Sequence, residues 1–483
     1  MKVYKYNKFL VIVILAFCSL ESSSHEVAEN FLALNQKLLD IVKKSKVPQS
    51  QLGLWVSVQN PTGTENILNI NAHQNMIPAS LSKLFTLGAS LHILGPSFKF
   101  QTRLVSNAEI KENTLKGNLY LVGGGDPVFA SEDFWALINQ LTRSKIHLIE
   151  GDLIVDDSMF DRVRIDENRD PKRSDDPYDA PVGAISLNLN TARILVRPSS
   201  EVGAACEIFA DPESQYLRLD NQCRTAASGQ ESVAIERIPE VSADRIHLSG
   251  SIGITHSEVE FFKNITQPDI WSGYHWLEFL KQRGIKVTGQ IRVGSAPHSA
   301  KVLASRQSQP LSLIAQDMAK FSNNFIAEML AKNIAAESGE RPATMKTGIN
   351  LIHHFLIEIG VDMNGIVFVS PSGFTRQNRI SAFSLSNYLQ IIQSDFSIFP
   401  EFLSALPVAG RDGTLKDRNK DTKHIGWIRA KTGTLDGVVG LSGYIGMTHG
   451  RSATFTFMFN GSIDQEEESR NLFDALAAEV AMD

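Results

Sequence analysis

Several features that define other classes of protein are absent from these 483 residues. The formal net charge is only −6, so the chain lacks the strong positive field that nucleic-acid binding needs. It has no evident repeats or low-complexity tracts, and outside the N-terminus it has no run of about 20 apolar residues. We therefore expect a mature protein that is soluble or only peripherally attached to a membrane.

A clear metal-binding pattern is also missing. His353 and His354 lie in a predicted helix and His424 lies near the start of a predicted strand. None has further ligands at the spacing of a metal site, which favours ordinary structural roles. We expect no metal and no other cofactor.

The N-terminus carries the pattern of an export signal. Three lysines within the first eight residues precede an apolar run over 9–17, and small and polar residues follow through Ser24. This predicts a signal peptide over 1–24 and a periplasmic mature protein, with a retained N-terminal anchor as the alternative.

Cysteine is scarce, with three residues in the chain. Removal of the signal removes Cys18 and leaves Cys206 and Cys223, which are expected to form a disulfide in an oxidising compartment. Two buried free thiols are the alternative. Phe17 departs from the small residue expected before a lipidated cysteine, so we do not expect lipoprotein attachment at Cys18.

Three short motifs follow one another along the chain. They are Ser80-Leu81-Ser82-Lys83, Ser322-Asn323-Asn324 and Lys431-Thr432-Gly433-Thr434. The order S-x-x-K, S-x-N, K-T-G is typical of penicillin-binding proteins and class A β-lactamases. It indicates acyl transfer through a serine ester, in which a lysine can replace a triad histidine as the base.

Some of the motifs have second copies, so their context has to decide between them. K-T-G also occurs at 346–348, where it leads into a helical apolar pattern, whereas 425–446 predicts strand, turn at Asp436-Gly437, strand. A K-T-G that binds a substrate carboxylate should lie on an edge strand, which favours the copy at 431–433. S-x-N also occurs at 186–188 and 469–471.

The residue types suggest roles for the first motif. Ser80 and Lys83 stand i, i+3 in a predicted helix with Pro78 near its start, so the lysine amine can reach the serine hydroxyl. Ser80 is the expected nucleophile and Lys83 its base, which requires a lowered lysine pKa. The alternative is an ordinary helix start with a surface lysine.

The other two motifs suggest substrate contacts. Ser322 can relay a proton towards the leaving amine, and the amide of Asn324 can hold the substrate backbone. Lys431 and Thr432 suit a peptide carboxylate. The list of expected substrate contacts is completed by Gly433 and Thr434, and the backbone N–H groups of Ser80 and Thr434 are the expected oxyanion hole.

The spacing of the motifs predicts a split catalytic domain. The stretch from Ser80 to Ser322 is more than twice as long as that from Ser322 to Lys431, and much of it has strand character. Helices, including one expected over Leu311–Ala336, and strands outside it predict an α/β (α+β) fold. The predicted units are a transpeptidase-like catalytic domain (25–99 and 299–483), an inserted β-rich domain (100–198 and 245–298) and a small nested domain (199–244).

Further segments give the motifs a family context. They are LVGGGDP (121–127), GDLIVDDSMFD (151–161), YDAPVGAISLN (178–188), SGFTRQNRIS (372–381), LPVAGRDGTL (406–415) and AKTGT (430–434). On these residues the mature chain resembles the low-molecular-mass class C penicillin-binding proteins, the D-alanyl-D-alanine carboxypeptidase/endopeptidase family S13. The resemblance implies a β-lactamase-like domain with two extra domains, hydrolysis of D-Ala–D-Ala and of peptidoglycan cross-links, and acylation by penicillin.

The resemblance also implies a side-chain subsite. Arg376 would engage the free carboxylate of a diaminopimelate side chain, with Tyr178 and Leu435 as walls of the same pocket. A structural salt bridge is the alternative for Arg376, and core packing for the other two. Two segments depart from the family pattern: 370–373 reads SPSG where the family has a sequence closer to DGSG, and Arg173 lies where an acidic residue is usual, with Asp175 and Asp176 as possible substitutes.

Three functions fit these observations. The leading one is a periplasmic serine DD-carboxypeptidase/DD-endopeptidase that acts on peptidoglycan peptides and is inhibited by β-lactams. A serine β-lactamase shares the motifs but lacks so large an insert. A non-catalytic peptidoglycan-binding scaffold would have no reason to keep Ser80, Lys83, Asn324 and Lys431. The oligomeric state stays open.

Overall fold

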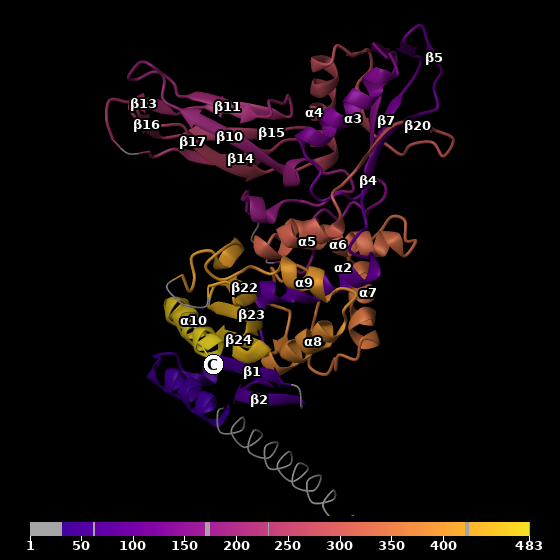
Figure 1. Cartoon of the computed structure of the whole chain (residues 1–483). Helices are drawn as coiled ribbons and strands as arrows, with labels where there is room; N and C mark the ends of the chain where they lie inside the picture. Colours follow the sequence, from indigo (N-terminus) through magenta and orange to yellow (C-terminus); the bar gives the residue numbers. More distant parts are fainter. Residues whose placement is uncertain (1–30, 61–62, 170–173, 230, 421–424, 483) are drawn as a thin grey trace, which may run out of the picture.

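The computed structural model describes residues 31–482 except 61–62, 170–173, 230 and 421–424. The predicted signal peptide, Cys18, Arg173 and His424 therefore lie outside the described residues. Figure 1 shows a body built around one sheet, a second unit above it, and a long β-arm that projects sideways from that unit. No helix within the described ranges is both long enough and apolar enough to cross a membrane.

The body is organised around an antiparallel five-stranded sheet. In spatial order its strands are β2 (Gly63–Ile70), β1 (Leu52–Asn60), β24 (Ser452–Asn460), β23 (Val438–Gly446) and β22 (Ile428–Leu435). The K-T-G strand β22 therefore lies at an edge, as predicted, and Asp436-Gly437 forms its turn into β23. An edge strand keeps one row of backbone groups free to pair with another chain.

Both faces of this sheet are covered by helices. On β1, Leu52, Leu54 and Val56 pack against helical residues 31–44 and α10 (Glu466–Met482), whereas Trp55 faces the other helical layer. That layer contains α2 (Lys83–Ile93), α5 (Leu311–Lys320), α6 (Asn324–Glu337), α7 (Met345–Glu358), α8 (Ala382–Ser394) and α9 (Phe399–Ala405). Because both faces are buried, β1 reads as a continuous apolar run rather than as an alternating one.

The second unit has two mixed sheets and two helices. One sheet orders β19 (Ile291–Val293), β9 (Leu153–Asp156), β7 (Leu119–Val122), β4 (Gln101–Ser106) and β20 (Lys301–Gln307). The other orders β18 (Lys286–Val287), β8 (Leu148–Ile149), β6 (Thr114–Leu115) and β5 (Ile110–Lys111). The helices α3 (Ser131–Arg143) and α4 (Pro268–Gln282) pack against the larger sheet.

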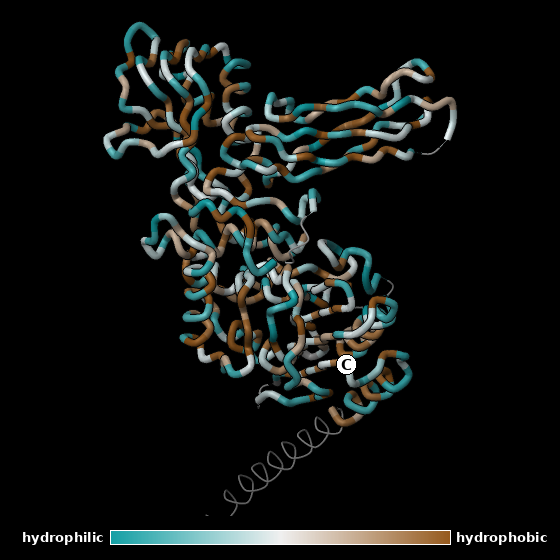
Figure 2. Tube along the Cα trace, turned by 180° about the vertical axis from the view of Figure 1, so that it is seen from behind, coloured by the Kyte–Doolittle hydropathy of each residue, from teal (hydrophilic) through white to brown (hydrophobic). Residues whose placement is uncertain are grey.

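The regular elements of the arm, within the residues that the structure describes, are strands. Its sheets order β11 (Glu207–Asp211), β10 (Thr191–Arg197) and β17 (Val259–Asn264); β12 (Leu217–Asn221), β15 (Asp244–Ser249) and β14 (Ala234–Pro239); and β13 (Arg224–Ala226) with β16 (Ser251–Gly253). Figure 2 shows hydrophobic and hydrophilic residues alternating along these strands, as expected where one face is packed and the other meets water.

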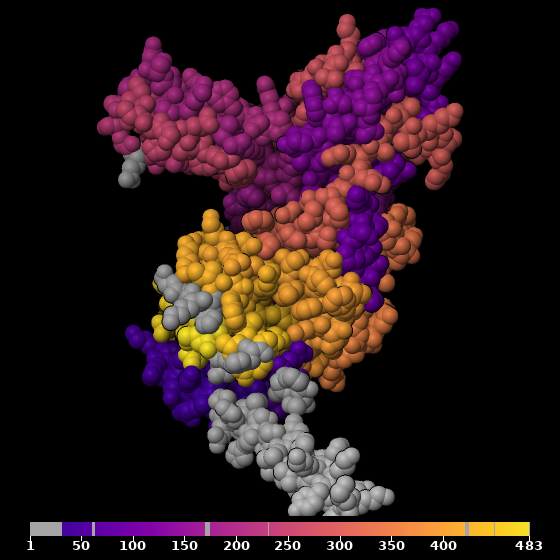
Figure 3. All heavy atoms as spheres, in the orientation of Figure 1, coloured from indigo at the N-terminus to yellow at the C-terminus, as the bar shows by residue number. Residues whose placement is uncertain are grey.

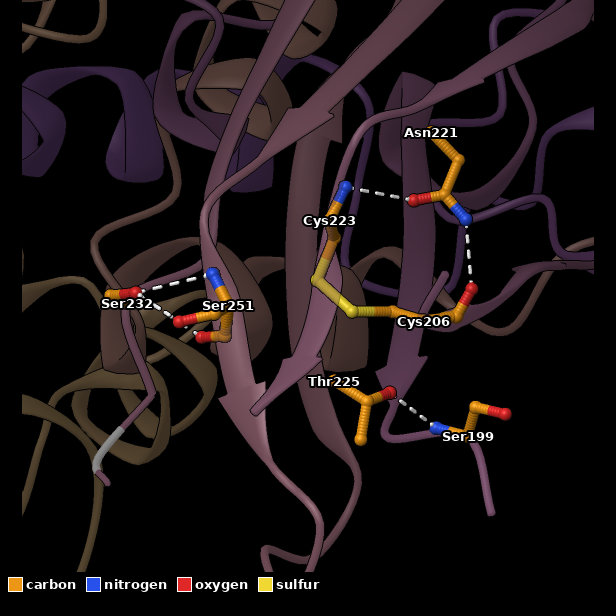
Figure 4. Close-up of a disulfide and its surroundings, with 7 residues drawn as sticks. All are labelled: Ser199, Cys206, Asn221, Cys223, Thr225, Ser232 and Ser251. Carbon is orange, nitrogen blue, oxygen red and sulfur yellow. Dashed lines mark hydrogen bonds between the residues drawn. A yellow bond between two sulfur atoms is a disulfide. The ribbon is translucent and has the colours of Figure 1, made fainter. Parts of the chain in front are cut away.

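The predicted disulfide lies in the arm. Cys206 and Cys223 are bonded, with their Cα atoms 5.4 Å apart and both side chains buried. Figure 4 shows Asn221 beside them: its amide donates to the carbonyl of Cys206, and its side-chain oxygen accepts from the backbone N–H of Cys223. The disulfide prediction is confirmed.

The structure differs from the predicted units at three places. β20 pairs with β4, so 301–307 belongs to a sheet of the second unit and not to the catalytic body. The arm strands run from β10 to β17, which is wider than the 199–244 expected for a nested unit. Two helices, α3 and α4, lie in the insert expected to be β-rich. These differences arise because pairing partners far apart in sequence are set by tertiary packing, which a local pattern does not report.

Candidate active site

The nucleophile motif lies on a tight turn that leads into α2. Ser80 is in the 3-10 helix η2 (Ala79–Ser82), and the α-helix itself begins at Lys83, so the predicted helix starts with a 3-10 turn. η2 rests on the edge of the main sheet, where Gly433 and Gly440 face each other across β22 and β23. A Cβ on either glycine would come within 2.7 Å of η2 or of the residue before it. The absence of a side chain at these two positions lets the serine motif lie directly on the K-T-G strand.

Lys83 is buried at the centre of the site. Its side chain is 1% exposed, and its Nζ lies 2.9 Å from Ser80 Oγ, 2.7 Å from Asn324 Oδ1 and 2.6 Å from the carbonyl oxygen of Ser372. Burial lowers the pKa of Lys83 well below its ordinary value, and the cations Lys431 and Arg169 lower it further, against the opposing effect of Glu328. The arrangement favours a neutral amine beside the serine hydroxyl.

The S-x-N motif lies at a break between two helices, which corrects the single helix predicted over Leu311–Ala336. α5 ends at Lys320, and Ser322 adopts a left-handed backbone with φ = 56°. The side chain of Asn323 then accepts a hydrogen bond from the N–H of Ile326 and caps α6. The sequence pattern continues through this break because both helices bury an apolar face, so periodicity did not reveal it.

The break aims the motif at the other two. Asn324 is the first residue of α6; its Oδ1 accepts from Lys83, and its Nδ2 donates to the carbonyl of Tyr178 at 3.2 Å. Ser322 Oγ lies 2.8 Å from Lys431 Nζ. The structure therefore brings the three motifs into direct contact.

Lys431 lies below this contact on β22. It is fully buried, and burial lowers its pKa to about 7. Besides Ser322, its Nζ donates to the carbonyl of Thr432 at 2.8 Å. Thr432 is partly exposed and its hydroxyl donates to that of Thr414, 2.8 Å away, while Thr434 is exposed at the open edge of the strand. Thr414, which follows Gly413 in the LPVAGRDGTL segment, was not predicted as a site residue.

The 370–378 segment supports the site from the side of α2. Ser372 supplies the carbonyl to Lys83, and Thr86 of α2 donates to the carbonyl of Pro371 at 2.8 Å. Asn378 donates to Ser82 Oγ at 2.9 Å and accepts from the N–H groups of Val369 and Ser370. The sequence departs from the family pattern here, yet the segment holds Lys83 through its backbone. A backbone contact of this kind carries no residue-type signal, so sequence reasoning missed it.

A buried charge cluster lies one turn further along α6. Arg169 donates to Asp179 at 2.7 Å and to Glu328 at 2.7 Å, and all three side chains are at most 1% exposed. Glu328 follows Asn324 by four residues, so both point from the same face of the helix. We call Arg169, Asp179 and Glu328 the buried trio. A glutamate on an apolar helix face was the available signal for it; Arg169, in a charged loop, gave none.

A large cavity opens beside the cleft, with a volume of about 920 Å³. Its walls include all three predicted side-chain subsite residues, Arg376, Tyr178 and Leu435. Tyr178 is 48% exposed and packs edge-on against Phe374, and Arg376 donates to the carbonyl of Asp436. Arg376 forms no ion pair with any carboxylate in the described part of the chain. Tyr178 is exposed and Leu435 is half-buried, so neither belongs to the hydrophobic core.

The duplicate motifs lie elsewhere in structural roles. Lys346 is near the start of α7, as predicted, and Ser186 and Asn188 bond to Gly183 and Ser131 in the second unit. Ser469 is in α10. His353 Nε2 donates to the carbonyl of Phe368. No cluster of three or more His, Cys, Asp or Glu suited to a metal occurs within the described residues.

Comparison with known proteins gives the family. Residues 34–481 match the model of the D-Ala-D-Ala carboxypeptidase 3 (S13) family. A D-alanyl-D-alanine carboxypeptidase from Actinomadura sp. (strain R39) is 31% identical over 438 residues, which are 88% of this chain and 80% of the relative. The D-alanyl-D-alanine carboxypeptidase DacB of Haemophilus influenzae is 24% identical over 85% of this chain and 86% of the relative.

The fold agrees with this match. A crystal structure of penicillin binding protein 4 (dacB) from Haemophilus influenzae superposes with a TM-score of 0.77 at 23% identity, over 91% of this chain and 99% of that one. A second structure of the same protein, complexed with a β-lactam, superposes with a TM-score of 0.72. The family model spans nearly the whole described chain, including the three motifs that meet in the cleft. The chain therefore belongs to the D-Ala-D-Ala carboxypeptidase 3 (S13) family of serine-type penicillin-binding hydrolases.

Proposed function

We propose that this chain is a DD-carboxypeptidase and DD-endopeptidase that cleaves peptidoglycan stem peptides and cross-links through an acyl-enzyme on Ser80. One observation carries the proposal: a desolvated lysine amine, Lys83 Nζ, lies 2.9 Å from Ser80 Oγ. A neutral amine has two N–H donors and one lone pair. Asn324 Oδ1 and the Ser372 carbonyl take the two donors, which leaves the lone pair for the serine proton.

Acylation then proceeds with simple proton accounting. As Ser80 Oγ attacks the carbonyl carbon of the scissile D-Ala amide, its proton passes to Lys83 Nζ. The negative charge that develops on the carbonyl oxygen is held by the backbone N–H groups of Ser80 and Thr434. When the C–N bond breaks, the leaving amine takes up a proton, and Ser322 is placed to relay it from Lys431. Water attacks the ester next, and Ser80 Oγ leaves and takes back the proton held by Lys83, which restores the neutral amine. The proton lost by the attacking water restores Lys431, and the product leaves as a carboxylic acid.

Substrate orientation follows from the edge strand. β22 can pair with an extended peptide along its free backbone row. Thr432 and Thr434 then lie at the terminal carboxylate, with the charge of Lys431 beneath them. Thr414 adds a further hydroxyl at this position because it already bonds to Thr432.

The side cavity is the proposed place for the side chain of the acyl-donor peptide. The exposed guanidinium of Arg376 suits a free carboxylate at the end of a long side chain, such as that of diaminopimelate. Tyr178 and Leu435 offer apolar walls for its methylene groups. Asp176, on the same cavity wall, can receive an ammonium group in place of the acidic residue that Arg173 replaces.

The compartment follows from the same chemistry. The relatives are named D-alanyl-D-alanine carboxypeptidases, and the Cys206–Cys223 disulfide fits an oxidising compartment. We propose a periplasmic enzyme exported by its N-terminal segment.

Intact-protein mass spectrometry after brief incubation with benzylpenicillin tests the proposal. The wild type should gain the mass of one whole penicillin, because opening of the β-lactam ring on Ser80 releases no leaving group. Ser80→Ala should gain none. Release of D-Ala from a pentapeptide and cleavage of a cross-linked dimer should both vanish in the same variant.

The S-x-N copies provide a matched control. Asn324→Ala should slow acylation, whereas Asn471→Ala, at the exposed asparagine of the copy on α10, should leave it unchanged. Fast drug hydrolysis without a lasting adduct would instead indicate a β-lactamase. A wild type that neither reacts with the drug nor cleaves either peptide would overturn the enzymatic proposal.

A further inference from the structure

The cavity beside the cleft has a second wall that the S13 motifs do not include. On the cleft side it is lined by Phe374, Thr375, Arg376, Thr434, Leu435 and Asp436. On the far side it is lined by Ile235, Glu236 and Arg237 of β14. These residues precede the K-T-G strand by at least 191 positions in the sequence. β14 belongs to the arm, and Figure 3 shows the deep recess between the arm and the body.

The arm wall is held in place at its root. Asp175 accepts from the backbone N–H of Arg237 at 2.9 Å and pairs with Lys263 of β17 at 2.8 Å. Asn264 donates its side-chain amide to the carbonyls of Ser174 and Asp176. These contacts attach two arm strands to the 174–179 segment, so β14 is presented to the cavity by a fixed set of bonds rather than by a free loop.

The same segment reaches the catalytic residues. Three residues after Asp175, the carbonyl of Tyr178 accepts from Asn324, and the next residue, Asp179, belongs to the buried trio. The cavity wall and the catalytic asparagine are therefore positioned by one short stretch of chain. A ligand in the cavity would contact the segment whose Tyr178 carbonyl holds Asn324.

Each wall carries charges of both signs: Arg376 and Asp436 on the cleft side, Glu236 and Arg237 on the arm side. The guanidinium of Arg237 is already engaged, because it donates to Thr266 and lies 3.8 Å from Asp244. Arg376 is exposed on the cleft side, and Glu236 is exposed on the arm side. Neither forms an ion pair with a residue in the described ranges. Leu435 supplies apolar surface on the cleft side. Ile235 points from the opposite face of β14 to Glu236 and packs against the buried cluster that includes Leu248. A peptide with both a free carboxylate and a free ammonium group, joined by methylene groups, matches this distribution.

The size of the cavity also exceeds what a short substrate needs. Its volume of about 920 Å³ lies near the upper end of the range for pockets that enclose drug-sized ligands. In the proposed binding mode the terminal D-Ala–D-Ala unit pairs with β22, on the cleft side of the cavity. The space towards the arm is therefore available to a larger part of the substrate.

We propose that β14 forms a second substrate wall, on which Glu236 binds the ammonium group of a mixed-charge peptide, and that this wall makes the enzyme favour cross-linked stem peptides over short free ones. The inference rests on the proposed function, since it assigns the substrate of the same site. Glu236 acts here as a specificity residue: it binds a part of the substrate remote from the scissile bond and takes no part in acylation.

Steady-state kinetics on three ligands tests the second wall. They are benzylpenicillin, a diacetylated L-Lys-D-Ala-D-Ala tripeptide, and a cross-linked stem-peptide dimer without sugars. Glu236→Lys should lower kcat/KM about tenfold for the dimer, mainly through KM, and leave penicillin acylation and tripeptide hydrolysis within twofold of wild type. Glu236→Gln should have the same pattern with a smaller change. Glu201→Gln, an exposed arm glutamate outside the cavity, should change nothing.

The outcomes separate this inference from the proposed function. A wild type that penicillin does not acylate contradicts the function itself. Normal acylation with no loss for the dimer in Glu236→Lys overturns only the second wall. An equal loss on all three ligands also overturns it, because it would mean damage to the fold. Repeating the assay with a dimer that keeps its disaccharides tests a glycan: a loss seen only with the sugars would replace the peptide as the occupant and overturn the proposal as stated.

Discussion

The cleft and the arm contain the same group of charges in opposite surroundings. Beneath the cleft, Arg169 lies between Asp179 and Glu328, and no side chain of the three exceeds 1% exposure. On the arm, Arg193 lies between Asp211 and Glu260, and their side chains are 40–53% exposed. Each is one guanidinium bonded to two carboxylates. Only the surroundings differ.

That difference decides what each trio can do. Water screens the arm charges, so their pairing adds little to stability and has no long-range effect. The buried charges have lost their hydration and depend on one another, and they also act on Lys83 through a medium of low polarity. Both regions therefore have the same pairing of one arginine with two carboxylates, but only the pairing that is buried next to the site can influence the catalytic residues.

Removal of the arginine should give the largest contrast between the two trios. Arg169→Met removes the guanidinium that pairs with the buried carboxylate of Glu328, and the free energy of unfolding should fall by about 3–5 kcal/mol. Arg193→Met should lower it by less than about 1 kcal/mol. Urea denaturation of the full chain, followed by tryptophan fluorescence and by loss of penicillin acylation, measures both. Equal losses would contradict the role assigned to burial.

The two K-T-G copies test the same contrast with lysines. Lys431 is fully buried and bonded to Ser322, whereas Lys346 is exposed near the start of α7. Lys431→Met should slow penicillin acylation by about 10- to 100-fold, because a charged hydrogen bond contributes about 1.5–3 kcal/mol. Lys346→Met should not change it. Stopped-flow measurements with a fluorescent penicillin compare the two rates, and a comparable loss in both would show that the choice between the copies is wrong.

Sequence patterns predicted much of this site because its parts carry strong local signals. The edge position of Lys431 followed from a strand-turn-strand pattern, and the helix after Lys346 followed from apolar periodicity. The contact between Lys83 and Ser80 followed from their spacing. In each case the residues that decide the structure are neighbours in the sequence.

The missed features depend on distant partners. Arg169 lies in a stretch rich in Asp, Arg and Lys that reads as a solvated loop, yet it is buried because α6 offers Glu328 from 159 residues further on. The break at Ser322 interrupts an apolar pattern that would equally suit one long helix. Periodicity reports which face of an element is buried, but not which residue from elsewhere will lie against it.

A charge-neutralising change should have a moderate effect that appears only in the pH profile. Acylation needs the neutral form of Lys83, so its rate rises as pH passes through the pKa of that amine. Glu328 raises this pKa, so Glu328→Gln should lower it and move the acidic limb of the acylation profile to lower pH. Glu260→Gln, the matching change on the arm, should leave the limb in place. A shift to higher pH would contradict the assigned sign.

The smallest effect on acylation is expected from the arm disulfide. Cys206→Ser with Cys223→Ser removes a cross-link over a loop of 17 residues, which should destabilise the arm by about 3 kcal/mol. Because the arm root is held separately by Asp175, Lys263 and Asn264, the cleft should keep its geometry and the rate of penicillin acylation should stay within twofold of wild type. Limited proteolysis should show faster cleavage within 199–250, which verifies that the arm has loosened. If acylation falls together with arm stability, the arm and the cleft form one cooperative unit, and the contrast between the two regions holds for their charges but not for their folding.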